Sequence, residues 1–159
     1  MKIRVATISD ALAIAVLGSD IQELHHMSRS EWFRPPNAQG AVPLYEELLR
    51  DPAVTSYIAE DESGQTLGFV IARVIHRPET PLTWAATIVD IDQIGVSPSA
   101  RRRGVGHNLL QAIRELANEV SATLLHLTTW EFNAGAQSFF EAEGLAVEMR
   151  RMTMPWPTR

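Results

Sequence analysis

The segment SPSARRRGVGHNLL, residues 97–110, places three consecutive arginines and two glycines directly before an apolar-periodic run. A glycine-containing turn at a helix N-terminus presents backbone N–H groups that have no acceptor within the helix, and such groups bind anions. Gly104 and Gly106 allow the main chain to approach a ligand where a Cβ atom would block it. An arginine run is more often a solvated surface, but next to these glycines it adds charge that suits a pyrophosphate.

Two acidic residues precede this turn in the segment TWAATIVDIDQIGV. Strand alternation places Asp90, Asp92 and Ile94 on one face. Two acids on the same face of a central strand are unusual. In the alternative interpretation both acids are exposed or pair with an arginine such as Arg73 on the adjacent strand.

Two common phosphate-binding patterns fit the turn poorly. A Walker loop is excluded because RRRGVGHN contains no Gly-Lys-Ser/Thr. A dinucleotide-binding fingerprint needs a third glycine where this chain has Leu109, and it needs a tighter turn after the strand. Glu131 could still act as a ribose-binding acid, so a dinucleotide-binding domain stays an alternative.

The composition limits the class of protein further. The chain has 159 residues, which is most simply one domain over 1–159, and its formal charge is −5. This charge argues against nucleic acid and membrane as partners. The chain has no cysteine, which excludes disulfides, thiolate metal sites and a cysteine nucleophile. The apolar run 11–18 is too short to span a bilayer and lacks signal-peptide flanks, so we expect a cytoplasmic protein.

The elements that must position these residues follow from hydrophobic periodicity and turn signals. Antiparallel strands come first, and strand and helix then alternate, which predicts a mixed α/β fold. We expect strands at 2–7, 53–61, 67–77, 83–96, 122–130 and 145–154, and helices at 9–24, 43–51, 104–120 and 133–144, with an irregular segment over 25–42.

The pattern Arg101-x-x-Gly104-x-Gly106, after a strand that ends in IGV and a turn at Pro98, resembles the acyl-CoA-binding motif of the GNAT superfamily of N-acetyltransferases. NAGAQSFFEAEGL, residues 133–145, is similar to a later segment of that family, and IRVATISDALAI resembles its opening strand and helix. The resemblance implies a central mixed, mostly antiparallel sheet flanked by helices, with a splayed strand pair that binds acyl-CoA.

The resemblance also implies roles for individual residues. An amine acceptor attacks the thioester of the cosubstrate acetyl-CoA directly, without a metal, and a main-chain N–H stabilises the oxyanion. Asp92, followed by Asp90, is the candidate general base. The positions assigned to the cofactor are Ile94, Gly95, Val96, Arg101, Arg102, Arg103, Gly104, Val105, Gly106, His107, Asn133 and Phe140.

One position departs from the family pattern. Phe140 stands where the family usually has a tyrosine that protonates the leaving thiolate. Water or a hydroxyl of Ser138, Tyr45 or Tyr57 could replace it, or the thiolate could leave unprotonated. A non-catalytic acyl-CoA-binding or sensing module is therefore an alternative to the enzyme.

The histidines and the last predicted strand say less about the function. His25 and His26 could line an acceptor pocket or act as a base, but they lack a third metal ligand at suitable spacing, and we expect no metal. The final strand could pair across a homodimer. The sequence does not identify the acceptor amine. Acids near the strand and in EWFR and YEELL favour a cationic small molecule, and a peptide N-terminus or a lysine of a protein stays an alternative.

Overall fold

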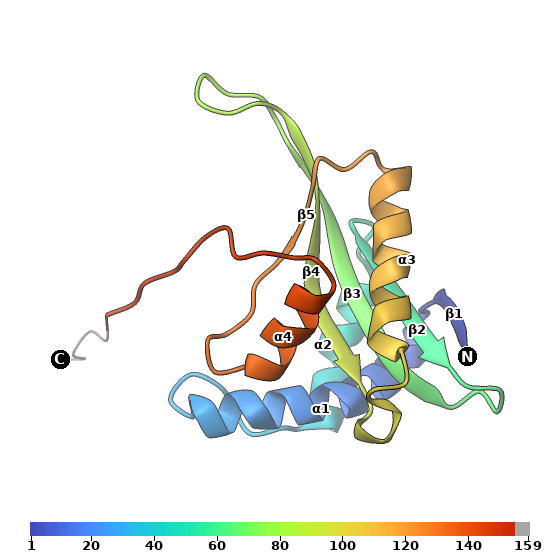
Figure 1. The fold of residues 1–159 in the computed structure, drawn as a ribbon. Helices are drawn as coiled ribbons and strands as arrows, with labels where there is room; N and C mark the ends of the chain where they lie inside the picture. The colour runs from blue at the N-terminus through green and yellow to red at the C-terminus, as the bar shows by residue number, and fades with distance from the viewer. Residues whose placement is uncertain (155–159) are drawn as a thin grey trace. The chain divides into compact units, whose positions relative to one another are not determined.

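The computed structural model describes residues 1–154 and separates into two compact units (Figure 1). The first unit, Met1–Thr128, contains a five-stranded sheet and the helices α1, α2 and α3. The second unit begins at Thr129 and contains the helix α4, Ala134–Ala142. None of the helices in residues 1–154 combines the length and the hydrophobicity that crossing a membrane requires.

The sheet has the order β1-β2-β3-β4-β5. Its strands β1 (Lys2–Val5), β2 (Val54–Glu60), β3 (Thr66–Arg77) and β4 (Ala86–Val96) pair antiparallel. The strand β5, Leu124–Leu127, runs parallel to β4, which requires the crossover through α3. The predicted mixed, mostly antiparallel sheet is confirmed.

Helices cover both faces of this sheet (Figure 1). On one face α1 (Ala11–Ser28) and α2 (Ala38–Arg50) pack over a core that includes Phe69. On the other face α3, Val105–Glu119, lies over Gly68, where a Cβ atom would come within 3.0 Å of Val105. Alternate residues of β3 therefore contact different helices, as the two-residue strand period requires.

The predicted apolar stripe of α3 is buried. Val105, Leu109, Ile113 and Leu116 are 0–7% exposed, and Leu110 beside them is also buried. Each fully buried aliphatic side chain of this kind contributes about 1.5–3 kcal/mol. The stripe holds α3, and with it the arginine-glycine turn, against the sheet.

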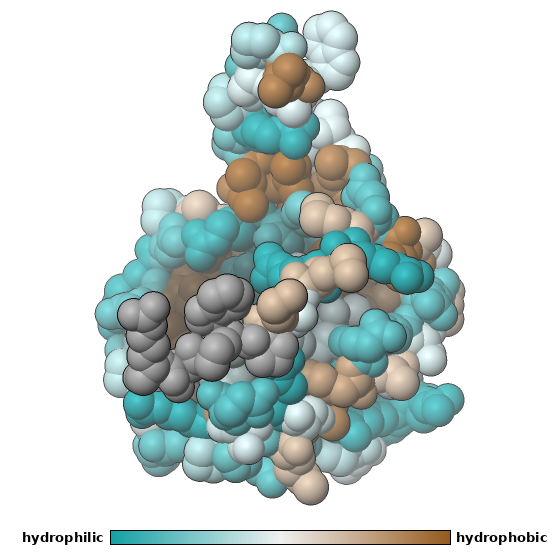
Figure 2. Space-filling model, turned by 90° about the vertical axis from the view of Figure 1, so that its left-hand side faces the viewer, coloured by the Kyte–Doolittle hydropathy of each residue, from teal (hydrophilic) through white to brown (hydrophobic). Residues whose placement is uncertain are grey.

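The β3–β4 hairpin extends beyond the rest of the sheet (Figure 1). The β2 strand pairs with β3 only as far as Arg73, and β5 pairs with β4 only from Ile88 onward. Figure 2 shows hydrophobic side chains at the base and near the tip of this arm, among hydrophilic ones. Leu82 is 93% exposed and Trp84 is 81% exposed.

Two predictions in the N-terminal half are wrong in their boundaries. The helix predicted to begin at Pro43 begins at Ala38, because Oδ1 of Asn37 accepts a hydrogen bond from the Gly40 amide at 2.9 Å and caps the helix there. His25 and His26, expected in an irregular segment, form the last turn of α1. Pro43 lies inside α2 and removes one intrahelical hydrogen bond.

The last predicted strand is also wrong. Residues 145–154 form no strand, although their sequence alternates, and Val147, Met149, Met152 and Met154 are 75–93% exposed. Alternation produces a strand only where a neighbouring strand supplies hydrogen-bond partners. The preceding helix is as predicted, with Asn133 at its start and Gly144 beyond its end at φ 89°.

Candidate functional site

The turn between β4 and α3 leaves a helix N-terminus open. After Val96 the chain forms a short 3₁₀ helix, Pro98–Ala100, and then reaches Gly104, the N-cap of α3, at φ 77°. Gly104 has no side chain to cap the helix, and the first bond within α3 runs from the Asn108 amide to the Gly104 carbonyl. The preceding amides of α3 therefore have no acceptor inside the helix, and the dipole there favours an anion.

The three arginines differ in their surroundings. Nη2 of Arg101 lies 3.8 Å from Oδ2 of Asp20 on α1, and its Nε donates to the Val96 carbonyl at 3.4 Å. Arg102 and Arg103 are exposed and have no ion pair with another residue of the described part of the chain. Arg101 thus helps to fix the turn, and the other two guanidinium groups can meet an anionic ligand.

The edge of β4 opens just before this turn. The pairing of β4 with β5 ends at Ile91 and Leu127, whereas β4 continues to Val96. Over its last residues β4 pairs on its other side with β3, where Gly95 faces Phe69. The predicted segment 94–96 therefore has an outer edge without a strand partner in residues 1–154, and an extended ligand can pair with such an edge.

Packing against the core explains why position 95 is a glycine. A Cβ atom at this position would lie 2.6 Å from Cε1 of Phe69 and 3.2 Å from Cδ1 of Ile21. A larger side chain would therefore displace the core ring that supports the open end of β4.

The register of β4 against β3 shifts by one residue at Asp92. Ile91 pairs with Ala72 and Gln93 pairs with Ile71, so Asp92 is an extra residue without a partner in β3. This is the pairing of a β-bulge, which bends a strand and changes its alternation. The bulge coincides with the point at which β4 separates from β5.

The bulge changes which residues share a face. Asp90 pairs with Arg73, and Nε of Arg73 lies 3.9 Å from Oδ2 of Asp92, so both acids lie on the face of α1 and α2. Ile94 pairs with Val70 on the face of α3. The prediction that Asp90, Asp92 and Ile94 share one face is therefore wrong for Ile94, because the alternation is interrupted between them.

The two acids have different environments. Partial burial raises the pKa of Asp92, Arg73 lowers it, and the neighbouring Asp90 raises it again. The main partner of Arg73 is Asp51 at the end of α2, which accepts from Nη1 at 2.6 Å. The pairing with Arg73 that the sequence left as an alternative is thus present for Asp92, but Asp51 holds the guanidinium more closely.

His126 joins this group of charged residues, although no sequence pattern selected it. The parallel register places it beside Asp90, with 3.6 Å between its Nε2 and Oδ1 of Asp90. Only the pairing of β5 with β4 brings the two together, and no local motif encodes that pairing. The pair stands one position before the end of the β4–β5 ladder.

The candidate proton donors lie in three different places. Tyr45 is 7% exposed, its hydroxyl donates to Oε1 of Gln93 at 2.9 Å, and burial raises its pKa. Tyr57 faces a groove on the side of α3, and Ser138 is exposed on α4. Neither Tyr45 nor Tyr57 lies on the open segment of β4.

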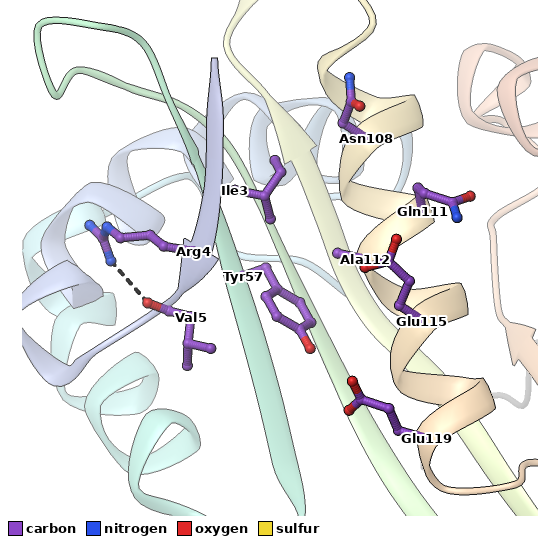
Figure 3. A pocket seen from close by; sticks show the side chains of 9 residues that line it. All are labelled: Ile3, Arg4, Val5, Tyr57, Asn108, Gln111, Ala112, Glu115 and Glu119. Atoms are coloured by element: carbon purple, nitrogen blue, oxygen red, sulfur yellow. Dashed lines mark hydrogen bonds between the residues drawn. The ribbon is translucent and has the colours of Figure 1, made fainter.

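The groove beside Tyr57 has a volume of about 440 Å³ and lies between β1, β2 and α3 (Figure 3). Burial raises the pKa of Tyr57, and the carboxylates of Glu119 and Glu115 raise it further. In Figure 3 the phenol extends from β2, and the two carboxylates extend from α3. None of the residues predicted to bind the cofactor lines it.

The second unit carries the two remaining predicted site residues. Oδ1 of Asn133 accepts from the Ala136 amide at 3.1 Å and caps α4. Phe140 is 7% exposed, and its ring centroid lies 5.2 Å from that of Phe139. Both residues thus have a structural function within α4. In residues 1–154 no three His, Cys, Asp or Glu side chains form a group that could hold a metal ion.

Comparison with known proteins identifies the family. The family model described as Acetyltransferase (GNAT) family matches residues 21–145. An uncharacterized N-acetyltransferase, YhfO of Bacillus subtilis (strain 168), is 31% identical over 144 residues, which cover 91% of this chain and 89% of YhfO. The L-2,4-diaminobutyric acid acetyltransferase of Nocardia farcinica (strain IFM 10152) is 30% identical over 139 residues, which cover 85% of this chain and 66% of that protein.

Solved structures agree with the fold. The tetramutant of the BH1408 protein from Bacillus halodurans has a TM-score of 0.93 at 22% identity, covering 98% of this chain and 100% of that chain. The aminoglycoside N-acetyltransferase AAC(6')-Iy in complex with CoA has a TM-score of 0.75 at 20% identity, covering 99% of this chain and 95% of that chain. The chain therefore belongs to the GNAT family, as an acetyl-CoA-dependent N-acetyltransferase.

Proposed function

We propose that this chain transfers the acetyl group of acetyl-CoA to a small cationic primary amine by direct attack, in the cytoplasm and within one domain of residues 1–159. The observation that carries the proposal is the succession of an open strand edge and an uncapped helix N-terminus. β4 loses its β5 partner after Ile91, and α3 begins at Val105 without a side-chain cap. An extended arm that ends in a pyrophosphate suits this succession.

The cofactor roles follow the chain. The backbone of residues 94–96 pairs with the pantetheine arm, and the amides of residues 102–107 hold the pyrophosphate together with the exposed Arg102 and Arg103. Asn133 and Phe140 keep the cofactor role that the family resemblance implies for them. Because Oδ1 of Asn133 is engaged in capping α4, its amide nitrogen is the group that we assign to the cofactor.

The proton must leave the amine before or during attack. Asp92 accepts it, and the amine nitrogen bonds to the thioester carbonyl carbon. The carbon–sulfur bond then breaks to release CoA thiolate, and the second N–H proton leaves to water as the amide forms. Partial desolvation raises the pKa of Asp92 and makes it a stronger base than a fully solvated aspartate. Phe140 cannot protonate the thiolate, so we assign that proton to water.

The charges on the face of α1 and α2 favour a cationic acceptor. Asp51, Asp90 and Asp92 together outnumber the one fixed positive charge among them, Arg73. The name of the Nocardia relative specifies L-2,4-diaminobutyric acid, an amine with a second charged nitrogen. Small diamines and diamino acids are therefore the acceptors to test first.

The decisive experiment is a panel of amines with detection of free thiol. We expect acetyl-CoA to stabilise the protein thermally and diamines to release CoA thiol. Stabilisation without thiol release by any amine would favour the acyl-CoA-sensing alternative. Stabilisation by NAD and not by CoA would contradict the cofactor assignment.

The role of Asp92 has its own test. Asp92→Asn should lower kcat/KM near neutral pH, and the loss should shrink as pH rises because a larger share of the amine is then already unprotonated. Glu62→Gln, which removes an exposed carboxylate in the β2–β3 turn, is the matched control. An unchanged pH–rate profile would remove Asp92 as the base.

A further inference from the structure

A partly buried hydrogen bond joins α2 to β4 beside the bulge. The Tyr45 hydroxyl donates to Oε1 of Gln93 at 2.9 Å, and Tyr45 packs in the same core cluster as Ile14 and Phe69. Tyr45 is 7% exposed, so a hydroxyl that lost this acceptor would have little access to water. The bond therefore holds the Gln93 side chain on the face of α1 and α2.

The position of Gln93 decides the register of β4. With the observed pairs, Gln93 opposite Ile71 and Ile91 opposite Ala72, Asp92 must be the extra residue. In a regular ladder continuing from Ile91, Gln93 would lie opposite Val70 instead. A one-residue slip moves every following side chain to the other face, so Gln93 would then point toward α3 and away from Tyr45. The hydrogen bond is compatible only with the bulged register.

A glycine in α1, Gly18, leaves the space that the Tyr45 hydroxyl occupies. A Cβ atom at Gly18 would lie 2.8 Å from the Tyr45 oxygen, so this position of α1 has no room for even a methyl group unless the hydroxyl moves. Glycine in the interior of a helix is about 1 kcal/mol less favourable than alanine. Gly18 is therefore a second, independent feature that accommodates the Tyr45 hydroxyl.

We infer that Tyr45 and Gln93 are positioning residues that hold β4 in its bulged register and so present Asp92 at the point where β4 leaves β5. The inference rests on the role of Asp92 in the proposed function. It extends that function because the position of the base then depends on Tyr45 of α2 and on the space that Gly18 of α1 leaves for its hydroxyl. Neither residue lies on the cofactor turn.

The first test compares two substitutions in the same core cluster. Tyr45→Phe keeps the ring and removes the hydroxyl, and we expect kcat/KM for the amine to fall about tenfold, as loss of one hydrogen bond allows. Ile14→Val removes a methylene from the same cluster, and it should lower Tm without a comparable fall in rate. Gly18→Ala should reproduce the kinetic loss of Tyr45→Phe although alanine favours the helix.

The second test is a double-mutant cycle with Asp92→Asn. If Tyr45 acts through Asp92, Tyr45→Phe should cost less than about twofold in the Asp92→Asn background, because coupled residues are not additive. A purely structural effect would cost the same factor in both backgrounds. Hydrogen exchange supplies a readout that does not depend on activity, and the amides of residues 92–96 should exchange faster in Tyr45→Phe than in Ile14→Val.

The outcomes separate the inference from the proposed function. Equal losses for Tyr45→Phe in both backgrounds, or unchanged exchange at residues 92–96, would overturn the positioning role. A normal rate in Asp92→Asn together with faster exchange in Tyr45→Phe would overturn the role of Asp92. The inference that Tyr45 and Gln93 hold β4 in its bulged register would then still be supported.

Discussion

The helices α2 and α3 begin in opposite ways. Asn37 caps α2 with its own side chain, which accepts from the Gly40 amide at 2.9 Å. Gly104 precedes α3 in the left-handed conformation, at φ 77°, and offers no capping atom. In every α-helix the first amides have no acceptor within the helix. At α2 the side chain of Asn37 supplies an acceptor, whereas Gly104 has no side chain that could do so at α3.

A side-chain oxygen also accepts from a backbone amide near the start of two other helices, which we call a closed helix start. Asn133 caps α4 as Asn37 caps α2. Before α1, the carboxylate of Asp10 accepts from the Thr7 amide at 2.7 Å and from Nη2 of Arg4 at 2.7 Å. At these places side-chain oxygens accept the hydrogen bonds of backbone amides. At α3 we expect the oxygens of a pyrophosphate to accept them.

The largest effect should come from placing an anion at the open N-terminus. Gly104→Asp introduces a carboxylate where the cofactor phosphates are expected, and we predict about a hundredfold loss of acetyl-CoA affinity or more. Gly64→Asp is the matched control, since Gly64 also has a left-handed φ, 83°, with no atom within 4 Å of an added Cβ. Isothermal titration of both variants checks this, and equal affinities would refute the site.

The next largest effect should be a loss of folding stability when Asp10, in the turn before α1, is replaced. Hydrogen bonding to Arg4, and further bonds from Thr7, lower the pKa of Asp10 from 3.8 to about 2 despite its burial. A lowered folded-state pKa stabilises the fold above pH 4 and loses this contribution as pH falls from about 4 to 2. Asp10→Asn should therefore cost about 2 kcal/mol at pH 7 and flatten the acid dependence of unfolding.

Urea unfolding at pH 7 and at several pH values below 4 measures this change. Glu79→Gln, at an exposed position of the β3–β4 arm, controls for loss of a surface carboxylate. If Asp10→Asn leaves the free energy of unfolding and its acid dependence as they are in the parent protein, the carboxylate does not close this turn.

The smallest effect compares two asparagine caps. Asn37→Ala and Asn133→Ala should each cost about 1 kcal/mol of stability, the usual contribution of an N-cap. Only Asn133→Ala should also weaken acetyl-CoA binding, because only Asn133 is assigned to the cofactor. Binding and thermal unfolding measured on both variants would show whether that second role exists, and identical affinities would exclude it.

The parts of the fold that depend on local sequence were predictable. The stripe of α3 and the glycine turn before it are encoded within 20 residues, and so are the two caps on α4, Asn133 and Gly144. The start of α2 was missed because Pro43 suggested a first helical position, while Asn37 farther upstream supplies the cap. A helix begins where its amides are satisfied, and this weighs more than one proline.

The features that depend on distant contacts were not predictable. The bulge at Asp92 depends on the pairing of β4 with β3, and the hydrogen bond beside it joins Tyr45 and Gln93, which lie 48 positions apart in the chain. The pair of His126 and Asp90 depends on the register of β5. The alternating segment 145–154 lacks a strand partner and forms no strand. Simple alternation therefore misplaced Ile94 and could not suggest His126.

The most direct test of the cofactor site is to follow the backbone amide signals of the protein by NMR while acetyl-CoA is added. We predict that the largest changes fall on the amides of residues 102–107 and 94–96, at the open N-terminus of α3 and the open edge of β4. Changes centred instead on the groove between β1, β2 and α3 (Figure 3), with the turn unaffected, would contradict this assignment.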